Sequence, residues 1–130
     1  VMKTSAEYEK ISPEIVEYDE NLCQGADVLI VTHGVVSRAA DDAVKALRAQ
    51  GIKASYFRPI TLRPFPAKQL REAIAKSGAK KMLIAESAYG QLDRLTKQKI
   101  YGETIAIDHL FMPGVGIVDH DIITKVKSML

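Results

Sequence analysis

The stretch DVLIVTHGVVSRAADDAVKALRAQG, Asp27 to Gly51, predicts a buried strand, a tight turn and an amphipathic helix in succession. Residues 28–31 are four consecutive apolar residues, three of them β-branched, as in a parallel strand that is covered on both faces. From about Ser37 onward, apolar residues recur at helical spacing, at Ala40, Ala43, Val44 and Leu47. Gly51 then stands where a helix commonly ends in a residue with positive φ. This stretch therefore predicts the first strand and helix of a βαβ unit.

The rest of the chain continues the alternation of strand and helix. Strands are predicted at residues 52–57, 82–86 and 104–108. One helix is predicted to begin with Pro66 as its first residue, and others to follow Tyr89-Gly90 and Asp119. Connections of about 20 residues between parallel strands are long enough to hold a helix, and such crossovers are right-handed. The fold class is therefore α/β, a three-layer α/β/α arrangement with a mostly parallel sheet.

The N-terminal part differs from this pattern. Residues 1–25 are predicted to be a lead-in segment, and residues 26–130 to be the α/β domain. Within the lead-in, Glu14 to Asp19 (EIVEYD) alternates apolar and acidic residues, which suits a half-exposed edge strand. All 130 residues fit one domain. A valine precedes the first methionine, which is expected either for a piece of a longer chain or for a residue added in cloning.

Two segments rich in proline or glycine are predicted to be loops. Arg58 to Pro66 has three prolines in nine residues, and it is not expected to continue a central strand because proline has no N–H to donate. His109 to Val118 contains one proline and two glycines. Asp119 follows this second loop and is predicted to be the N-cap of the last helix.

Composition excludes several classes of protein. The net charge is only +2 and the basic residues are spread along the chain, so no nucleic-acid partner is expected. No apolar run approaches the length of a membrane span. The single cysteine, Cys23, leaves no intrachain disulfide and no all-cysteine metal or cluster site. A cytoplasmic location with no membrane contact is the expectation.

Ligands of open α/β sheets bind beyond the carboxyl ends of the strands, so the functional residues are sought there. Those ends hold His33-Gly34, Arg58-Pro59, Glu86-Ser87 and Asp108-His109. His33 has the chemistry of a general base. A single histidine in a strand-to-helix turn, however, is more often a hydrogen-bonded turn residue.

Two further ligand sites can be considered from the sequence. Gly34, Ser37 and Arg38 enter a helix N-terminus and are a weak candidate for an anion site, although neither G-x-G-x-x-G nor G-x-x-x-x-G-K-[ST] is present there. The run Asp119-His120-Asp121, together with Asp108-His109, suggests a metal site. Acidic residues at a helix start are the favoured interpretation of that run, because they complement the helix dipole.

A resemblance adds to what the residues indicate. The segments ADVLIVTHGVVSRAADDAVKALRAQGIKASYFRPITLRPFP and KKMLIAESAYGQLDRL resemble the second domain of the α subunit of 2-oxoacid:ferredoxin oxidoreductases. These are the thiamine-diphosphate enzymes that include 2-oxoglutarate and pyruvate synthases. The resemblance runs from about Ala26 to Leu95. Its most specific parts are RPITL from Arg58 followed by PFP, and Glu86 followed by Gly90-Gln91-Leu92.

The resemblance implies a particular sheet. The second domain of that family is similar to the C-terminal domain of transketolase, a five-stranded, mostly parallel sheet with one antiparallel edge strand. The implied strand order in this chain is 15–19 (antiparallel), 52–57, 28–33, 82–86 and 104–108.

The resemblance also implies a function for a larger complex. Such a complex oxidatively decarboxylates a 2-oxoacid to an acyl-CoA, with ferredoxin as the electron acceptor. Thiamine diphosphate, magnesium and the iron–sulfur clusters are then held by other domains and subunits, so this domain is expected to bind no cofactor and to carry no catalytic residue. Its partners are the other domains of the α subunit and the β subunit, with ferredoxin and CoA as partners of the whole complex. The alternatives are a free-standing protein that binds a small anion, and a small hydrolase that uses His33 with Ser37 or Ser87 as nucleophile.

An interface is predicted at the carboxyl edge of the sheet. Its candidate residues are Arg58, Pro59, Glu86, Tyr89, Gly90 and Gln91. Only the central strand separates Arg58 from Glu86 in the implied order, and tyrosine and arginine are enriched where interfaces concentrate binding energy. These side chains are expected to point outward toward a partner. The alternative is an internal Arg58–Glu86 salt bridge, which stabilises little when exposed.

Overall fold

The computed structural model describes residues 17–33, 36–60, 65–86, 91–111 and 118–130. Its strands are β1 (Tyr18–Asn21), β2 (Val28–Thr32), β3 (Ala54–Pro59), β4 (Lys81–Glu86) and β5 (Ala106–Phe111). Its helices are α2 (Val36–Ala49), α3 (Ala67–Ser77), α4 (Gln91–Lys99) and α5 (Asp119–Met129). Among these helices none is long and apolar enough to cross a bilayer.

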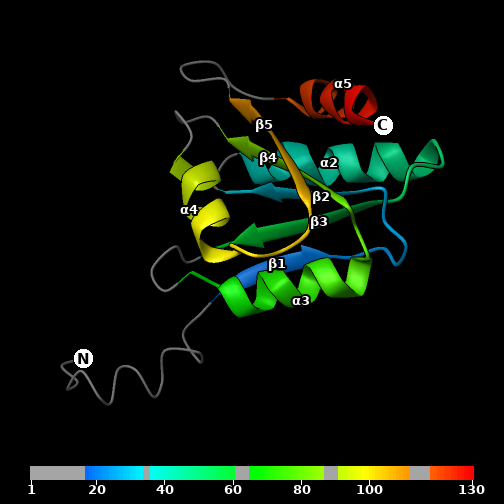
Figure 1. Ribbon diagram of the computed structural model, residues 1–130. Helices are drawn as coiled ribbons and strands as arrows, with labels where there is room; N and C mark the ends of the chain where they lie inside the picture. Colours follow the sequence, from blue (N-terminus) through cyan, green and yellow to red (C-terminus); the bar gives the residue numbers. More distant parts are fainter. Residues whose placement is uncertain (1–16, 34–35, 61–64, 87–90, 112–117) are drawn as a thin grey trace, which may run out of the picture.

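The five strands form one sheet in the order β1-β3-β2-β4-β5 (Figure 1). β1 pairs antiparallel with β3, and the remaining pairs are parallel. This order and the antiparallel edge strand confirm the predicted fold. β2 is central, and all five of its residues are buried. A parallel strand with helices on both sides needs apolar side chains on both faces, which explains the continuous apolar run from Val28 to Val31.

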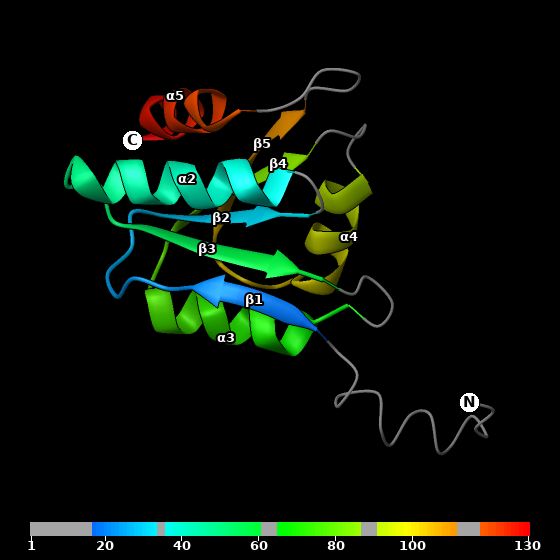
Figure 2. The ribbon, with the colours of Figure 1, turned by 180° about the vertical axis from the view of Figure 1, so that it is seen from behind.

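Helices cover both faces of the sheet (Figure 2). α2 and α5 lie on one face over a core that includes Ile30, Val44 and Ile122. α3 and α4 lie on the other face over a core that includes Leu29, Phe57 and Leu70. The predicted inward positions of α2, Ala40, Ala43, Val44 and Leu47, are all fully buried. Gly51 has φ of +84°, as predicted for the end of this helix.

Both edge strands lie later in the chain than predicted. β1 is Tyr18–Asn21 instead of Glu14–Asp19, and residues 14–16 are outside the described part. Three of its four residues are exposed, which an edge strand tolerates without the apolar alternation on which the prediction depended. β5 is Ala106–Phe111 instead of 104–108, because its pairing with β4 continues to Glu86. His109 and Leu110 are therefore in a strand, where a loop was predicted.

β3 extends into the segment that was predicted to be a loop. It runs to Pro59 instead of ending at Phe57, so Arg58 and Pro59 are strand residues. The parallel pairing with β2 stops at Phe57, and only the antiparallel pairing with β1 reaches Pro59. The prediction was wrong here because proline is excluded from the middle of a sheet but tolerated at the end of a strand.

Two helix starts also differ by one residue. Pro66 is the N-cap of α3, where it was expected as the first helical residue. Asp119 was predicted to be the N-cap of α5, but Val118 occupies that position. The acidic side chain that caps this helix is Asp121, whose carboxylate accepts a hydrogen bond from the Val118 N–H at 3.0 Å. A carboxylate at the third helical position can reach back in this way. An acidic residue therefore caps this helix as predicted, but the capping residue is Asp121 and not Asp119.

Candidate functional site

The candidate site is the edge of the sheet where β2, β3 and β4 end, at Thr32, Pro59 and Glu86. β2 lies between β3 and β4, so only one strand separates Arg58 from Glu86. The strand order thus places the two residues as the sequence predicted. Of the other candidate residues, Tyr89 and Gly90 lie outside the described residues, and Gln91 is the first residue of α4.

Glu86 is buried and caps a helix. Only 4% of the residue is exposed. One carboxylate oxygen accepts a hydrogen bond from the Leu92 N–H and the other from the Asp93 N–H, both at 2.9 Å. These N–H groups belong to the first turn of α4, where a helix has donors without intrahelical acceptors and where its dipole favours negative charge. The side chain therefore joins the end of β4 to the start of α4 and does not point outward as expected.

Arg58 lies on the strand next to the centre and has a different partner. Its guanidinium is 3.7 Å from the carboxylate of Asp19, its register partner on β1. The side chains are 35% and 59% exposed, so this ion pair contributes little to stability. The Arg58 Nε is buried without a hydrogen-bond acceptor. The predicted alternative, an internal Arg58–Glu86 salt bridge, is wrong, because each side chain contacts other groups.

His33 is hydrogen-bonded to the neighbouring strand. Its Nδ1 lies 3.1 Å from the carbonyl oxygen of Pro59. Because a carbonyl only accepts, this contact requires the proton on Nδ1. It ties the end of β2 to the end of β3 and agrees with the interpretation of His33 as a hydrogen-bonded turn residue.

The anion-site candidates at the start of α2 are only partly available. Ser37 is buried, and its hydroxyl oxygen accepts a hydrogen bond from the Thr32 hydroxyl at 3.2 Å. The Ser37 carbonyl accepts a bond from the Tyr56 hydroxyl at 3.3 Å. Arg38 is exposed, and Gly34 lies outside the described residues. The serine that was expected to assist an anion thus contributes to the packing between the helix and the sheet.

The acidic and histidine residues near the C-terminus do not form a metal cluster among the described residues, where no three such side chains come together. Asp108 instead contacts the His109 N–H at 2.8 Å and the Lys125 ammonium at 3.1 Å. The bond from the His109 N–H, and then that from Lys125, hold the pKa of Asp108 below its ordinary value. Asp121 is the helix cap described above.

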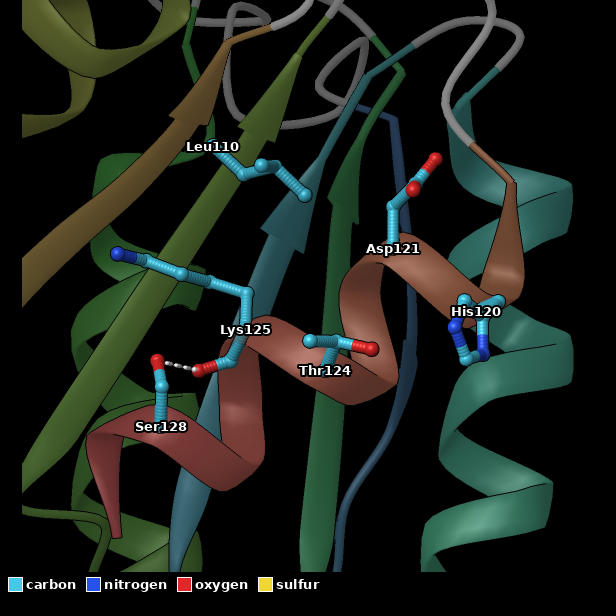
Figure 3. Close-up of a pocket in the computed structure, with 6 residues that line it drawn as sticks. All are labelled: Leu110, His120, Asp121, Thr124, Lys125 and Ser128. Atoms are coloured by element: carbon cyan, nitrogen blue, oxygen red, sulfur yellow. Dashed lines mark hydrogen bonds between the residues drawn. The ribbon is translucent and has the colours of Figure 1, made fainter.

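A shallow cavity of about 390 Å³ lies between β5 and α5 (Figure 3). It is lined by Leu110 from β5 and by His120, Asp121, Thr124, Lys125 and Ser128 from α5. Of these, sequence reasoning had singled out only His120 and Asp121. The other lining residues of α5 could have been found from the row of polar residues on one side of this helix. Asp121 and Lys125 already have partners within the chain, and Ser128 donates to the Lys125 carbonyl at 2.6 Å.

The first turn of α4 is not free to bind a phosphate group. A pyrophosphate commonly binds the N–H groups of a helix N-terminus, but here the Leu92 and Asp93 N–H groups already bind the Glu86 carboxylate. An all-cysteine iron–sulfur site needs several cysteines, and the chain has one.

The architecture belongs to the class of three-layer α/β/α domains with a transketolase-like sheet. The model of the family "Pyruvate:ferredoxin oxidoreductase core domain II" matches residues 26–123. The chain therefore belongs to this family of 2-oxoacid:ferredoxin oxidoreductase subunits.

Individual relatives agree with this family. The ketoisovalerate oxidoreductase subunit VorB of Methanothermobacter thermautotrophicus is 39% identical over 85 residues, which are 65% of this chain and 24% of that protein. A solved 2-oxoglutarate:ferredoxin oxidoreductase from Magnetococcus marinus superposes with a TM-score of 0.77 at 21% identity, over 98% of this chain and 24% of that chain. A split-gene transketolase superposes with a TM-score of 0.69 at 23% identity, over 85% and 40%. The two structural likenesses show the fold alone. The chain spans about a quarter of the length of the VorB relative.

Proposed function

We propose that this chain is a non-catalytic assembly domain of the α subunit of a thiamine-diphosphate-dependent 2-oxoacid:ferredoxin oxidoreductase. The complete complex would oxidatively decarboxylate a 2-oxoacid to an acyl-CoA and pass the electrons to ferredoxin, in the cytoplasm. The observation that carries the proposal is the family match over residues 26–123. The use of Glu86 and His33 in bonds within the chain supports a structural role for this edge of the sheet.

The partners of the domain would be the rest of the α subunit and the β subunit. The VorB relative is a subunit about four times as long as the matched part. Thiamine diphosphate, magnesium and the iron–sulfur clusters would be bound by those other parts, and CoA and ferredoxin would be partners of the whole complex. The VorB relative is named for ketoisovalerate and the Magnetococcus marinus enzyme for 2-oxoglutarate, so proteins that share this domain differ in their oxoacid. We therefore assign the choice of oxoacid to the other parts as well.

The proposed assembly surface is the carboxyl edge of the sheet. Its residues are Arg58, Pro59, Glu86, Tyr89, Gly90 and Gln91. Arg58 can contact a partner directly, since its side chain is one-third exposed and its ion pair with Asp19 is weak. Glu86 is buried, so its contribution to this surface would be indirect.

Calorimetric titration tests the non-catalytic role. The 130-residue chain, titrated with thiamine diphosphate and magnesium, should show no binding at concentrations up to about 100 μM, because Glu86 fills the α4 N-terminus where a pyrophosphate would bind. The complete α and β subunits, titrated in parallel, are the positive control. Micromolar binding by the chain alone would overturn the proposal.

A further inference from the structure

We infer that Glu86 is a positioning residue of the assembly surface: it acts as a built-in carboxylate ligand that holds the first turn of α4 in place. This inference rests on the proposed function, because it assigns a role to one residue of the proposed surface. It explains why a buried carboxylate ends β4, where an apolar residue would continue the core.

The hydrogen bonds of Glu86 are the first step. A carboxylate with 4% exposure loses its hydration, and charged groups are buried at this level only when they are compensated. Here each oxygen accepts one backbone N–H at 2.9 Å, from Leu92 and from Asp93. The arrangement is the one by which helix N-termini bind external anions, except that the anion is supplied by the chain itself.

The weakness of α4 without this contact is the second step. α4 has nine residues, and helices this short are marginal in water unless packing or capping stabilises them. α4 also carries two buried polar atoms without hydrogen-bond partners, Asp93 Oδ1 and Thr96 Oγ1. Each such atom opposes the packing of the helix. The Glu86 carboxylate is therefore a major support for the start of this helix.

The consequence for assembly is the third step. Glu86 is the last residue of β4 and Gln91 the first of α4, so the contact fixes the start of α4 at the carboxyl edge of the sheet. A fixed helix start lowers the conformational entropy that would be lost when a partner binds at this edge. Loss of the carboxylate should therefore weaken assembly in addition to loosening α4.

The experiment compares Glu86→Ala with wild type by amide hydrogen exchange and by the affinity for the rest of the α subunit and the β subunit. In Glu86→Ala, exchange at Leu92 and Asp93 should accelerate at least about tenfold while the β2 amides keep their protection, because two N–H groups lose their acceptors. Assembly should weaken at least about tenfold.

Formate supplies the decisive readout. As a small carboxylate, it should occupy the space left in Glu86→Ala. At about 100 mM it should restore most of the lost exchange protection and most of the lost assembly affinity by mass action. Chloride at equal ionic strength should restore them less, because a single spherical ion cannot place a separate acceptor oxygen on each of the two N–H groups as a carboxylate does. Glu86→Gln should be intermediate, since an amide has one acceptor oxygen.

Asp121→Ala is the matched control, because it removes a carboxylate that accepts an N–H at the start of α5. It should leave α4 exchange unchanged and give no response to formate. If Glu86→Ala does not fold, Glu86→Gln carries the comparison of α4 exchange and of assembly affinity with wild type.

Unchanged α4 exchange in the Glu86 variants would overturn the inference, and so would faster exchange spread evenly over the whole sheet. Faster α4 exchange with unchanged assembly would overturn the positioning role. A wild-type chain that fails to assemble would instead contradict the proposed function and leave the exchange result standing.

Discussion

The carboxylate of Asp108 links β5 to α5 by an ion pair. Its carboxylate accepts the His109 N–H and pairs with Lys125 of α5. These contacts lower its pKa in the folded state. A lowered pKa contributes stability that is fully present above the unfolded value, about 3.9, and is lost as the pH falls through the folded value.

Asp108→Asn should therefore reduce the free energy of unfolding above about pH 5 and lose this effect at acidic pH values below the lowered folded-state pKa, where the wild-type carboxyl group is also protonated. The Asp108 side chain is 43% exposed and screened by water, so the reduction should stay below about 1 kcal/mol. Urea unfolding across this pH range measures it. Asp42→Asn, at an exposed position of α2, is the control. A difference that persists undiminished at the acid end would contradict the assignment.

For Glu86 and Arg58, the sequence predicted the positions of the residues but not the contacts of their side chains. Their placement at the ends of β3 and β4, on either side of β2, followed from the strand order that the family resemblance implied. Their contacts did not, because the direction of a side chain depends on groups that only the fold brings near. Glu86 was expected to face a partner, yet the N–H groups six and seven residues later bind its carboxylate within the chain.

β2 is the element on which the rest of the sheet depends. Ile30 lies in its middle, is fully buried and pairs with Tyr56 on one side and Leu83 on the other. Ile30→Ala should lower the free energy of unfolding by about 2–5 kcal/mol through lost burial and a cavity. Ile60→Ala is a control of the same residue type at a 43% exposed position and should change it by less than about 0.5 kcal/mol. Equal effects of the two substitutions in urea unfolding would mean that β2 is not the core strand.

The sequence predicted the centres of the strands and helices better than their ends. The apolar runs of β2 and β4 and the helical stripes have periodic signals, and these elements lie where they were predicted. The ends of β1, β3 and β5 depend on pairing instead. β3 continues to Pro59 only because β1 lies antiparallel beside it, and β5 continues to Phe111 only because β4 reaches Glu86. The paired strands are distant in sequence, so the local pattern of residues does not show where each strand ends.

For the whole molecule, the fold and the family follow from ordered motifs spread over the chain, whereas the assembly surface depends on what surrounds it. Arg58 is suited to a contact outside this domain. Its side chain is 35% exposed, and its guanidinium lies 3.7 Å from the Asp19 carboxylate, beyond a normal hydrogen bond. The exposed end of such a guanidinium can form directed bonds to a carboxylate or a carbonyl of a partner.

Arg58→Ala should therefore weaken the affinity for the rest of the oxidoreductase by about tenfold or more, equivalent to about 1.4 kcal/mol. The stability of the domain should fall by less than about 1 kcal/mol, because the Asp19 pair is exposed. Asp19→Ala is the matched control: it removes the same ion pair and keeps the guanidinium, so it should leave assembly within about twofold of wild type. Surface plasmon resonance with the immobilised β subunit, with and without the remainder of the α subunit, measures both variants. If Arg58→Ala assembles as tightly as wild type, or if Asp19→Ala weakens assembly equally, Arg58 makes no direct contact and its role is confined to the edge of its own sheet.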